Sequence, residues 1–202
     1  MSSSNLIRWA GLAAILAGVL LVVGDLLDLA IGFGDEPFSE VATTGTHALQ
    51  SWIRLIGAVL LLIGLVGLYA RQSQAAGLLG LVGFLVAFLG TALATGFRWA
   101  ILFMAPSLAV AAPGFLNEGP PPGFFLMLIT FAVGWLLFGV ATLRARVYPR
   151  APAITLIVGA VLSLLPVPLV DIVLAAAVAW MGYVLFMERG AAVEPPSRAS
   201  QV

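Results

Sequence analysis

Six side chains of this chain carry charge or proton chemistry and stand at the ends of long apolar runs. Each run is of a length that crosses a bilayer. At such positions acids and arginines can pair with one another, hold an ion or bind a polar ligand. We call this set the outer polar cluster: Asp25, Asp28, His47, Arg54, Arg98 and Asp171.

The stretch 47–68 gives the first reason to expect that cluster. It begins with the polar letters HALQSWIR and continues as LIGAVLLLIGLVGL. On one helix, at about 100° per residue, His47, Gln50, Ser51 and Arg54 share a face. An arginine that leads into a membrane-type run is costly unless another group receives it. We therefore expect Arg54 to meet an acid from Asp25, Asp28 or Asp171.

Three interpretations of the cluster stay open at this point. The first, which we favour, is structural pairing among its members, because polar groups at the mouth of a helix bundle often satisfy one another. The second is an outward-facing site for a polar ligand or ion, and the third is that the members do not meet. His47 by itself indicates a helix start or a membrane interface rather than a proton switch.

Composition sets the class of protein. The chain has 202 residues, of which 62% are hydrophobic and 9% charged, and its mean hydropathy is +1.13. A soluble domain carries about 25% charged residues, so the bilayer must be the solvent for this chain. The zero net charge argues against a nucleic-acid partner. With no cysteine and one histidine, we expect no metal site and no cofactor.

No catalytic motif stands out in the sequence. We find no Walker motif, HExxH, GxSxG or acidic pair near the middle of an apolar run. The series Gly77, Gly80 and Gly83 has the spacing GxxGxxG inside an apolar stretch, which predicts helix packing rather than a nucleotide loop. We therefore expect a protein that is not an enzyme.

The apolar runs predict an all-α polytopic membrane bundle with about six transmembrane helices. The linker 71–74 (RQSQ) is short, so the second and third spans should form an antiparallel hairpin. Five prolines in 105–123 forbid one continuous helix there, and that segment should lie on the membrane surface or re-enter it. We expect one domain over 1–187 and a disordered tail over 188–202. The predicted spans are 6–31, 46–70, 75–104, 124–143, 153–165 and 169–187.

Arginine placement predicts the orientation. Seven of the nine arginines fall at one set of span ends, whereas Arg54 and Arg98 fall at the other. The positive-inside rule then places both termini in the cytoplasm, and the outer polar cluster at the opposite face. We therefore expect the protein in the cytoplasmic membrane of a bacterium. The first span should be a retained helix rather than a cleaved signal peptide.

Small residues form stripes that should face the bundle interior. In the first span the stripe holds Gly11, Ala14 and Gly18, with Leu12, Leu16 and other aliphatics opposite. Close helix approach favours small residues, and lipid suits long aliphatics. Tryptophans at 9, 52, 99 and 135 are expected to anchor the interfaces, and Trp180 to pack between helices.

Two further stretches carry a family resemblance. They are MAPSLAVAAPGFL (104–116) and GWLLFGVATLRARVYPR (134–150). In these stretches the chain resembles families of small bacterial multi-pass membrane proteins that have no assigned activity, so the resemblance assigns no functional residue.

For function we expect a non-enzymatic accessory or interaction subunit. The alternative is a small transporter or ligand-binding protein that uses the outer polar cluster. The expected partners are the lipid bilayer, another membrane protein or a second copy, with a small-molecule ligand left open.

Overall fold

The computed structural model describes residues 3–31, 36–165, 169 and 171–187. Within these ranges every regular element is a helix and no strand occurs, so the predicted all-α class is confirmed there. In chain order the helices are α1 (Ser3–Ile31), α2 (Phe38–Val41), α3 (Gly45–Phe103), α4 (Ala105–Ala111), α5 (Pro113–Asn117), α6 (Pro122–Ala145), α7 (Arg150–Leu162) and α8 (Asp171–Met187).

Three segments are long and apolar enough to cross a membrane. They are Asn5–Leu29, Gly45–Phe103 and Pro113–Ala145, whereas α7 and α8 have 13 and 17 residues and are shorter than a full span. The proline-rich segment forms the short helices α4 and α5, which confirms that no continuous helix runs through it. Residues 166–168, which separate the last two predicted spans, and the predicted tail 188–202 lie outside the described residues.

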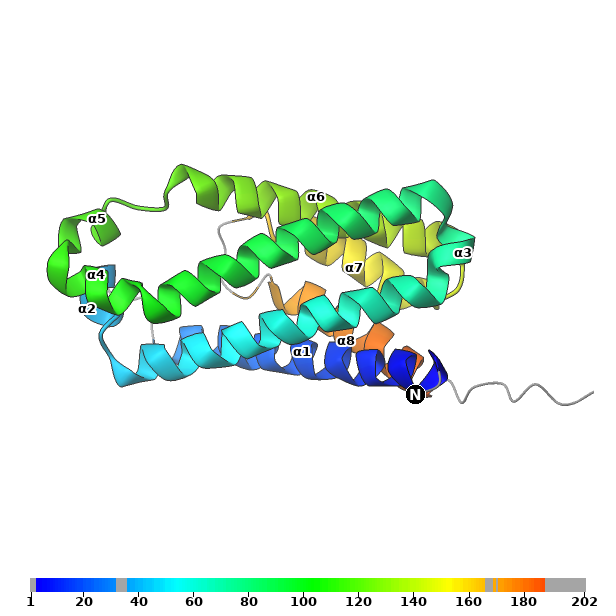
Figure 1. Ribbon diagram of the computed structural model, residues 1–202, viewed down its shortest axis with the longest axis horizontal. Helices are drawn as coiled ribbons and strands as arrows, with labels where there is room; N and C mark the ends of the chain where they lie inside the picture. Colours follow the sequence, from blue (N-terminus) through cyan, green and yellow to red (C-terminus); the bar gives the residue numbers. More distant parts are fainter. Residues whose placement is uncertain (1–2, 32–35, 166–168, 170, 188–202) are drawn as a thin grey trace, which may run out of the picture.

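α3 is a hairpin of two limbs, but it does not turn where the sequence indicated. Residues 71–74, expected to be a linker, are helical. The chain reverses at Gly77, whose φ of 57° and ψ of −153° interrupt the helix (Figure 1). That backbone conformation is open to glycine and hardly to any residue with a side chain. One glycine therefore replaces the predicted four-residue loop, and the first limb runs to Ala76.

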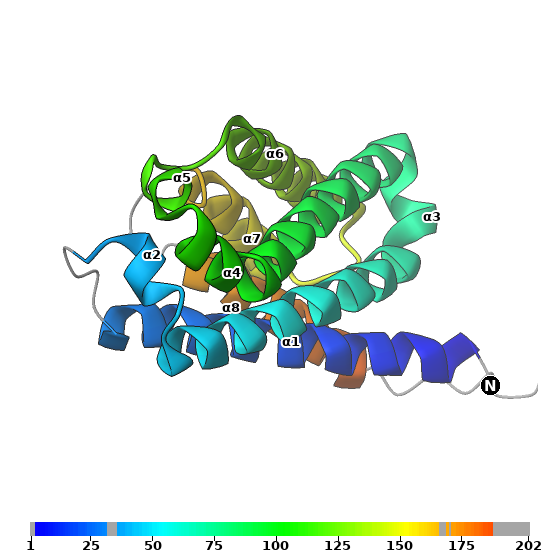
Figure 2. The ribbon, with the colours of Figure 1, turned by 60° about the vertical axis from the view of Figure 1, so that its left-hand side comes forward.

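The long segments form a closed ring around the core. The first limb of α3 packs on α1, the second limb on α6, α6 on α7, α7 on α8, and α8 again on α1. Rings stacked 4.3 Å apart, Tyr69 on Phe84, join the two limbs near their reversal. Figures 1 and 2 show α2, α4 and α5 gathered at one end of this ring, away from the start of α1 and from the α3 reversal. We call that end the capped end.

Glycines make the close contacts between neighbours in the ring. A Cβ on Gly18 would meet the Ala175 carbonyl oxygen of α8, and one on Gly64 would lie 2.8 Å from Ala14. In the same way, Gly83 of α3 lies against the backbone of Phe138 in α6. Only residues without a side chain let helix backbones approach so far. The predicted inward stripe of α1 is thus confirmed, and Leu16 on its opposite side is 44% exposed.

The large aromatic side chains follow the predictions only in part. Trp9, Trp52 and Trp99 are exposed, as interface anchors should be. The predictions for two other tryptophans are wrong. Trp135 is fully buried in the core, where its Nε1 donates to Thr91 Oγ1 at 3.1 Å, and Trp180 is 47% exposed rather than packed between helices. Trp135 lies in the middle of α6, so its depth excluded an interface role.

Candidate functional site

Arg54 is the centre of the site at the capped end. It lies on the first limb of α3, and its Nη2 donates to Asp25 Oδ1 at 2.8 Å and to Asp28 Oδ2. The same nitrogen lies 3.3 Å from the Gly24 carbonyl oxygen. Asp25 and Asp28 are three residues apart on α1 and therefore share one face of that helix. The structure thus brings together three of the six predicted residues.

The ion pair with Asp25 is the more deeply enclosed of the two. The side chain of Asp25 is 10% exposed and that of Arg54 is 14%, whereas Asp28 is 33% exposed. Asp25 Oδ2 and Arg54 Nε are buried and find no hydrogen-bond partner among the described residues. A buried charged group normally uses all its hydrogen-bonding atoms. This ion pair therefore leaves one carboxylate oxygen and one guanidinium nitrogen open to a further hydrogen-bonding partner, and both residues line a cavity.

Arg98 is the second guanidinium of the site, and it lies on the returning limb of α3. No carboxylate oxygen of a described residue lies within 4.0 Å of it, and no hydrogen bond to its side chain occurs among those residues. Its side chain borders two separate cavities. The structure therefore places Arg98 next to Arg54 and leaves it without an ion pair in the described part of the chain.

Asp171 approaches the cluster without joining its ion pairs. It is the first residue of α8 and is exposed. It lines the same cavity as Asp25, Arg54 and Arg98, although no ion pair within 4.0 Å links it to either arginine. Of the three acids expected to receive Arg54, Asp171 is the one that does not.

His47 lies at the start of α3, as the sequence indicated. Thr44 caps this helix, and its side chain accepts a hydrogen bond from the His47 backbone N–H at 3.3 Å. The imidazole Nε2 lies 3.4 Å from Ser51 Oγ, and the ring packs edge-on against Phe38 with centroids 5.5 Å apart. His47 touches none of the charged members of the cluster through a hydrogen bond or ion pair among the described residues.

Two cavities meet at the arginines. The upper cavity, of about 830 Å³, lies beneath the cap formed by α2, α4 and α5, and Asp28, His47, Phe115 and Glu118 are among its lining residues. The lower cavity, of about 360 Å³, is lined by Leu21, Leu61, Phe131 and Leu174 among others. Arg54, Phe97 and Arg98 line both. Binding sites for small molecules have volumes of about 300–1,000 Å³, so each cavity is of ligand size.

The lower cavity lies deeper in the ring than the arginines do. On the first limb of α3 it is bordered by Ala58 and Leu61, one and two turns beyond Arg54. On the second limb it is bordered by Thr91 and Ala94, which precede Arg98 and lie farther from the capped end. The site is therefore charged toward the capped end and mainly apolar toward the middle of the ring.

Two reciprocal hydrogen bonds between α2 and α5 close the cap, and the sequence contains no indication of them. The Ser39 N–H donates to Asn117 Oδ1 and the Asn117 Nδ2 donates to Ser39 Oγ, each at 3.1 Å. This reciprocal pair joins α2 to α5 across 78 residues of sequence. Helices of four and five residues are too short to give a periodic signal, so nothing in the sequence pairs these two polar residues.

A second polar contact was also missed, at the opposite end of the ring. Gln72 is buried at 1% exposure, and its Nε2 donates to Thr142 Oγ1 at 2.9 Å. From the sequence, Gln72 is expected in the linker 71–74. The helical course of 71–76 turns it inward instead, so its prediction as a loop residue is wrong.

The described residues contain no group of three or more His, Asp or Glu side chains placed to hold a metal ion. No family model matches this chain, and no match to it was found among curated proteins or solved structures. The geometry of the site therefore carries the argument for function.

Proposed function

We propose that this chain is a six-span membrane protein of the bacterial cytoplasmic membrane, with both termini in the cytoplasm, that binds a small polar ligand at its outer face. Six segments run along the ring, counting both limbs of α3, and this supports the span number. The start of α1 and the end of α8 lie at the same end, where Arg8 is 4.9 Å from the ring centroid of Phe186. The arginine bias supports a cytoplasmic position for that end.

The observation that carries the binding proposal is the position of Arg98. A guanidinium that lines two cavities, with no ion pair among the described residues, is costly in a membrane bundle unless something else compensates its charge. A ligand with an anionic group would do so, and arginine suits planar bidentate binding of carboxylate or phosphate. The cavities therefore move our proposal from the accessory subunit that the sequence favoured to a binding protein.

The test is to identify what co-purifies with the protein. Wild type and Arg98→Gln are extracted into polymer nanodiscs, purified and analysed by mass spectrometry for small molecules, lipids and other polypeptides. We expect one polar compound or lipid class to be enriched in wild type and to fall at least fivefold in Arg98→Gln. The matched control is Arg144→Gln, because Arg144 is exposed in the last turn of α6, far from the cavities.

Two results contradict the proposal. One is the same set of small molecules in wild type and Arg98→Gln, with both proteins shown to be folded by their melting curves. The other is a second polypeptide present in stoichiometric amount without any enriched small molecule, which is the result that an accessory subunit would give.

A further inference from the structure

The charges around the two cavities are of both signs and are unequal in number. Among the described lining residues there are two arginines, Arg54 and Arg98, and four acids, Asp25, Asp28, Asp171 and Glu118. Arg54 is already bound to two of those acids. What is left is one guanidinium, Arg98, with the carboxylates of Asp171 and Glu118.

This distribution limits the charge of a ligand. A simple anion would compensate Arg98 but would enter a site with an excess of carboxylates, which repel it. A simple cation would be attracted by the carboxylates but would leave Arg98 uncompensated. A molecule that carries one charge of each sign would compensate the charge of Arg98 with its anionic group and be attracted to the carboxylates by its cationic group.

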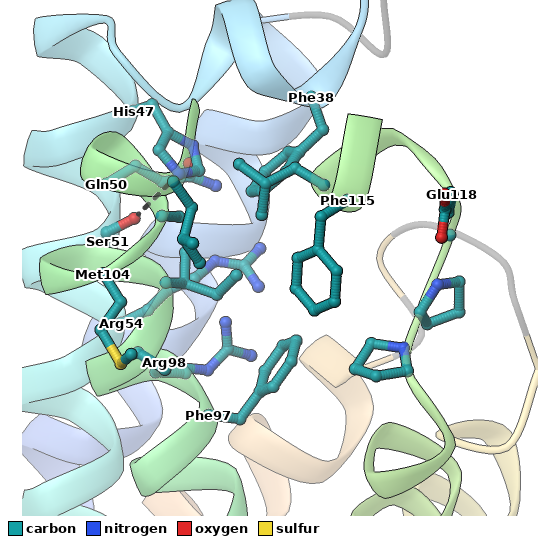
Figure 3. A pocket seen from close by; sticks show the side chains of 18 of the residues that line it. Phe38, His47, Gln50, Ser51, Arg54, Phe97, Arg98, Met104, Phe115 and Glu118 are labelled. Atoms are coloured by element: carbon teal, nitrogen blue, oxygen red, sulfur yellow. Dashed lines mark hydrogen bonds between the residues drawn. The ribbon is translucent and has the colours of Figure 1, made fainter. Parts of the chain in front are cut away.

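The two kinds of group are also separated in space in the way such a molecule needs. Figure 3 shows Arg54 and Arg98 on one side of the upper cavity and Glu118 on the other, with Phe97 and Phe115 between them. Aromatic faces beside a carboxylate attract ammonium groups, quaternary ones above all. The anionic group of the ligand would meet Arg98, and its ammonium would lie toward Phe115 and Glu118.

The lower cavity adds the third part of the ligand. It begins at Arg98, extends away from the capped end and has mainly apolar walls, including Leu21, Leu61, Leu128 and Leu174. An alkyl chain attached to the anionic group would enter it and point toward the membrane interior. This is the direction that acyl chains take in the outer leaflet, with the headgroup at the surface.

We propose that the site binds a zwitterionic single-chain amphiphile: an ammonium in the upper cavity, a phosphate or carboxylate at Arg98, and an alkyl chain in the lower cavity. This inference rests on the proposed function, because it specifies the ligand of the same site. It differs in what it requires, since an anionic or a chainless ligand would satisfy the proposed function but not this inference.

The experiment compares four probes that differ in charge and chain. They are dodecylphosphocholine, dodecyl phosphate, dodecyltrimethylammonium and phosphocholine, each in labelled form. Binding is measured to the full chain in phosphatidylglycerol nanodiscs, and binding to protein-free nanodiscs is subtracted. We expect dodecylphosphocholine to bind at least tenfold more tightly than each of the other three probes.

Variants assign each part of the ligand to its place. Arg98→Gln and Glu118→Gln should each weaken dodecylphosphocholine at least tenfold. Ala94→Phe and Ala58→Leu, which fill the lower cavity from two different limbs of α3, should do the same while phosphocholine binding stays within twofold. The matched control is Leu93→Phe, because Leu93 neighbours Ala94 but is exposed on the outer surface.

The outcomes separate the two proposals. Equal or tighter binding of dodecyl phosphate overturns the zwitterion, and equal binding of phosphocholine overturns the alkyl chain, while both leave the binding function standing. Unchanged dodecylphosphocholine affinity in both cavity-filling variants also overturns the inference. Binding of none of the four probes above protein-free nanodiscs overturns this inference, whereas the proposed function is decided by the co-purification experiment.

Discussion

Arg54 is held between two carboxylates of different burial, and this difference has a measurable consequence. Removing one partner of a desolvated ion pair leaves the other charge uncompensated, whereas removing both is far less costly. Asp25 is the more enclosed acid, and Asp28 is closer to solvent. The electrostatic interaction of Arg54 with Asp25 should therefore be the less screened of the two.

The first prediction is a double-mutant cycle at Arg54. Arg54→Ala should lower the free energy of unfolding by about 1–3 kcal/mol, below the loss of about 3–5 kcal/mol for a fully buried pair, because the mouth is partly exposed. Combining it with Asp25→Asn should recover part of that loss, with a coupling energy above about 0.5 kcal/mol. Reversible unfolding in mixed micelles provides the measurement.

Asp28→Asn and Asp171→Asn complete this cycle. The coupling to Asp28 should be smaller than that to Asp25, and the coupling to Asp171 should be absent within error, since Asp171 makes no ion pair with Arg54. A coupling to Asp171 as large as that to Asp25 would contradict the arrangement of the site.

The sequence predicted the members of this site better than their pairing. The sequence places Asp25, Arg54 and Asp171 at one level of the membrane, because each stands 17 residues from a charged residue at the other end of its apolar run. Spacing along a helix fixes the face of a residue but not the neighbouring helix that it meets. For that reason Asp171 was as good a candidate partner as Asp25 until the ring order was known. The sequence had no signal that Arg98 makes no ion pair with a described residue, or that Ser39 and Asn117 bind each other.

At the scale of the elements, the two limbs of α3 reverse direction at a single non-helical residue. Its limbs turn at Gly77, and an added Cβ at Gly77 would meet no atom within 4 Å. A substitution there is therefore strained by its backbone conformation alone and not by crowding. This distinguishes Gly77 from the ring glycines, where neighbouring backbone fills the space.

The second prediction uses that distinction. Gly77→Ala should lower the free energy of unfolding by about 1–3 kcal/mol, the cost of a side chain in a backbone region that belongs to glycine. Gly96→Ala is the matched control, because Gly96 also has open space around it but keeps an ordinary helical backbone. It should be neutral or stabilise the helix by up to about 1 kcal/mol. Equal melting temperatures of the two variants would contradict the assigned reversal.

The sequence predicted the existence of most elements and missed some of their ends. Apolar runs and prolines located α1, both limbs of α3 and α6, because length and hydropathy are strong signals in membrane helices. The polar letters RQSQ suggested a loop, yet tertiary contacts keep them helical and turn Gln72 toward Thr142. A local polar signal was therefore overruled by packing that sequence periodicity does not report.

At the scale of the whole molecule, the capped end and the reversal of α3 lie at opposite ends of the ring. If the protein spans the membrane as proposed, one of these ends meets the outside and the other the cytoplasm. Because the natural chain has no cysteine, a single introduced cysteine reports its own side. Exposed positions are available at both ends: Thr43 and Ser107 at the capped end, and Gln74 near the reversal.

The third prediction is the labelling pattern of these positions. Thr43→Cys and Ser107→Cys should react with an impermeant maleimide on intact cells, and Gln74→Cys should react only after the cells are opened. Three positions that sequence alone would suggest are poor choices, because Gln72 is buried and Ser39 and Asn117 bind each other. Labelling of Gln74→Cys from outside would reverse the proposed orientation.

The closed ring also bears on the order in which the protein is made. Gly18 of α1 lies against Ala175 and Ala179 of α8, and Gly11 lies against Gly182 and Phe186. Among the described helices, α1 is synthesised first and α8 last. If the chain is inserted into the membrane as proposed, this face of α1 is in contact with lipid until α8 has been made. The lower cavity is enclosed only when α8 is in place, because Asp171 and Leu174 of α8 line it. A chain that ends before α8 would keep most of its apolar sequence, but it would expose the small-residue face of α1 and lack the Leu174 wall of the lower cavity.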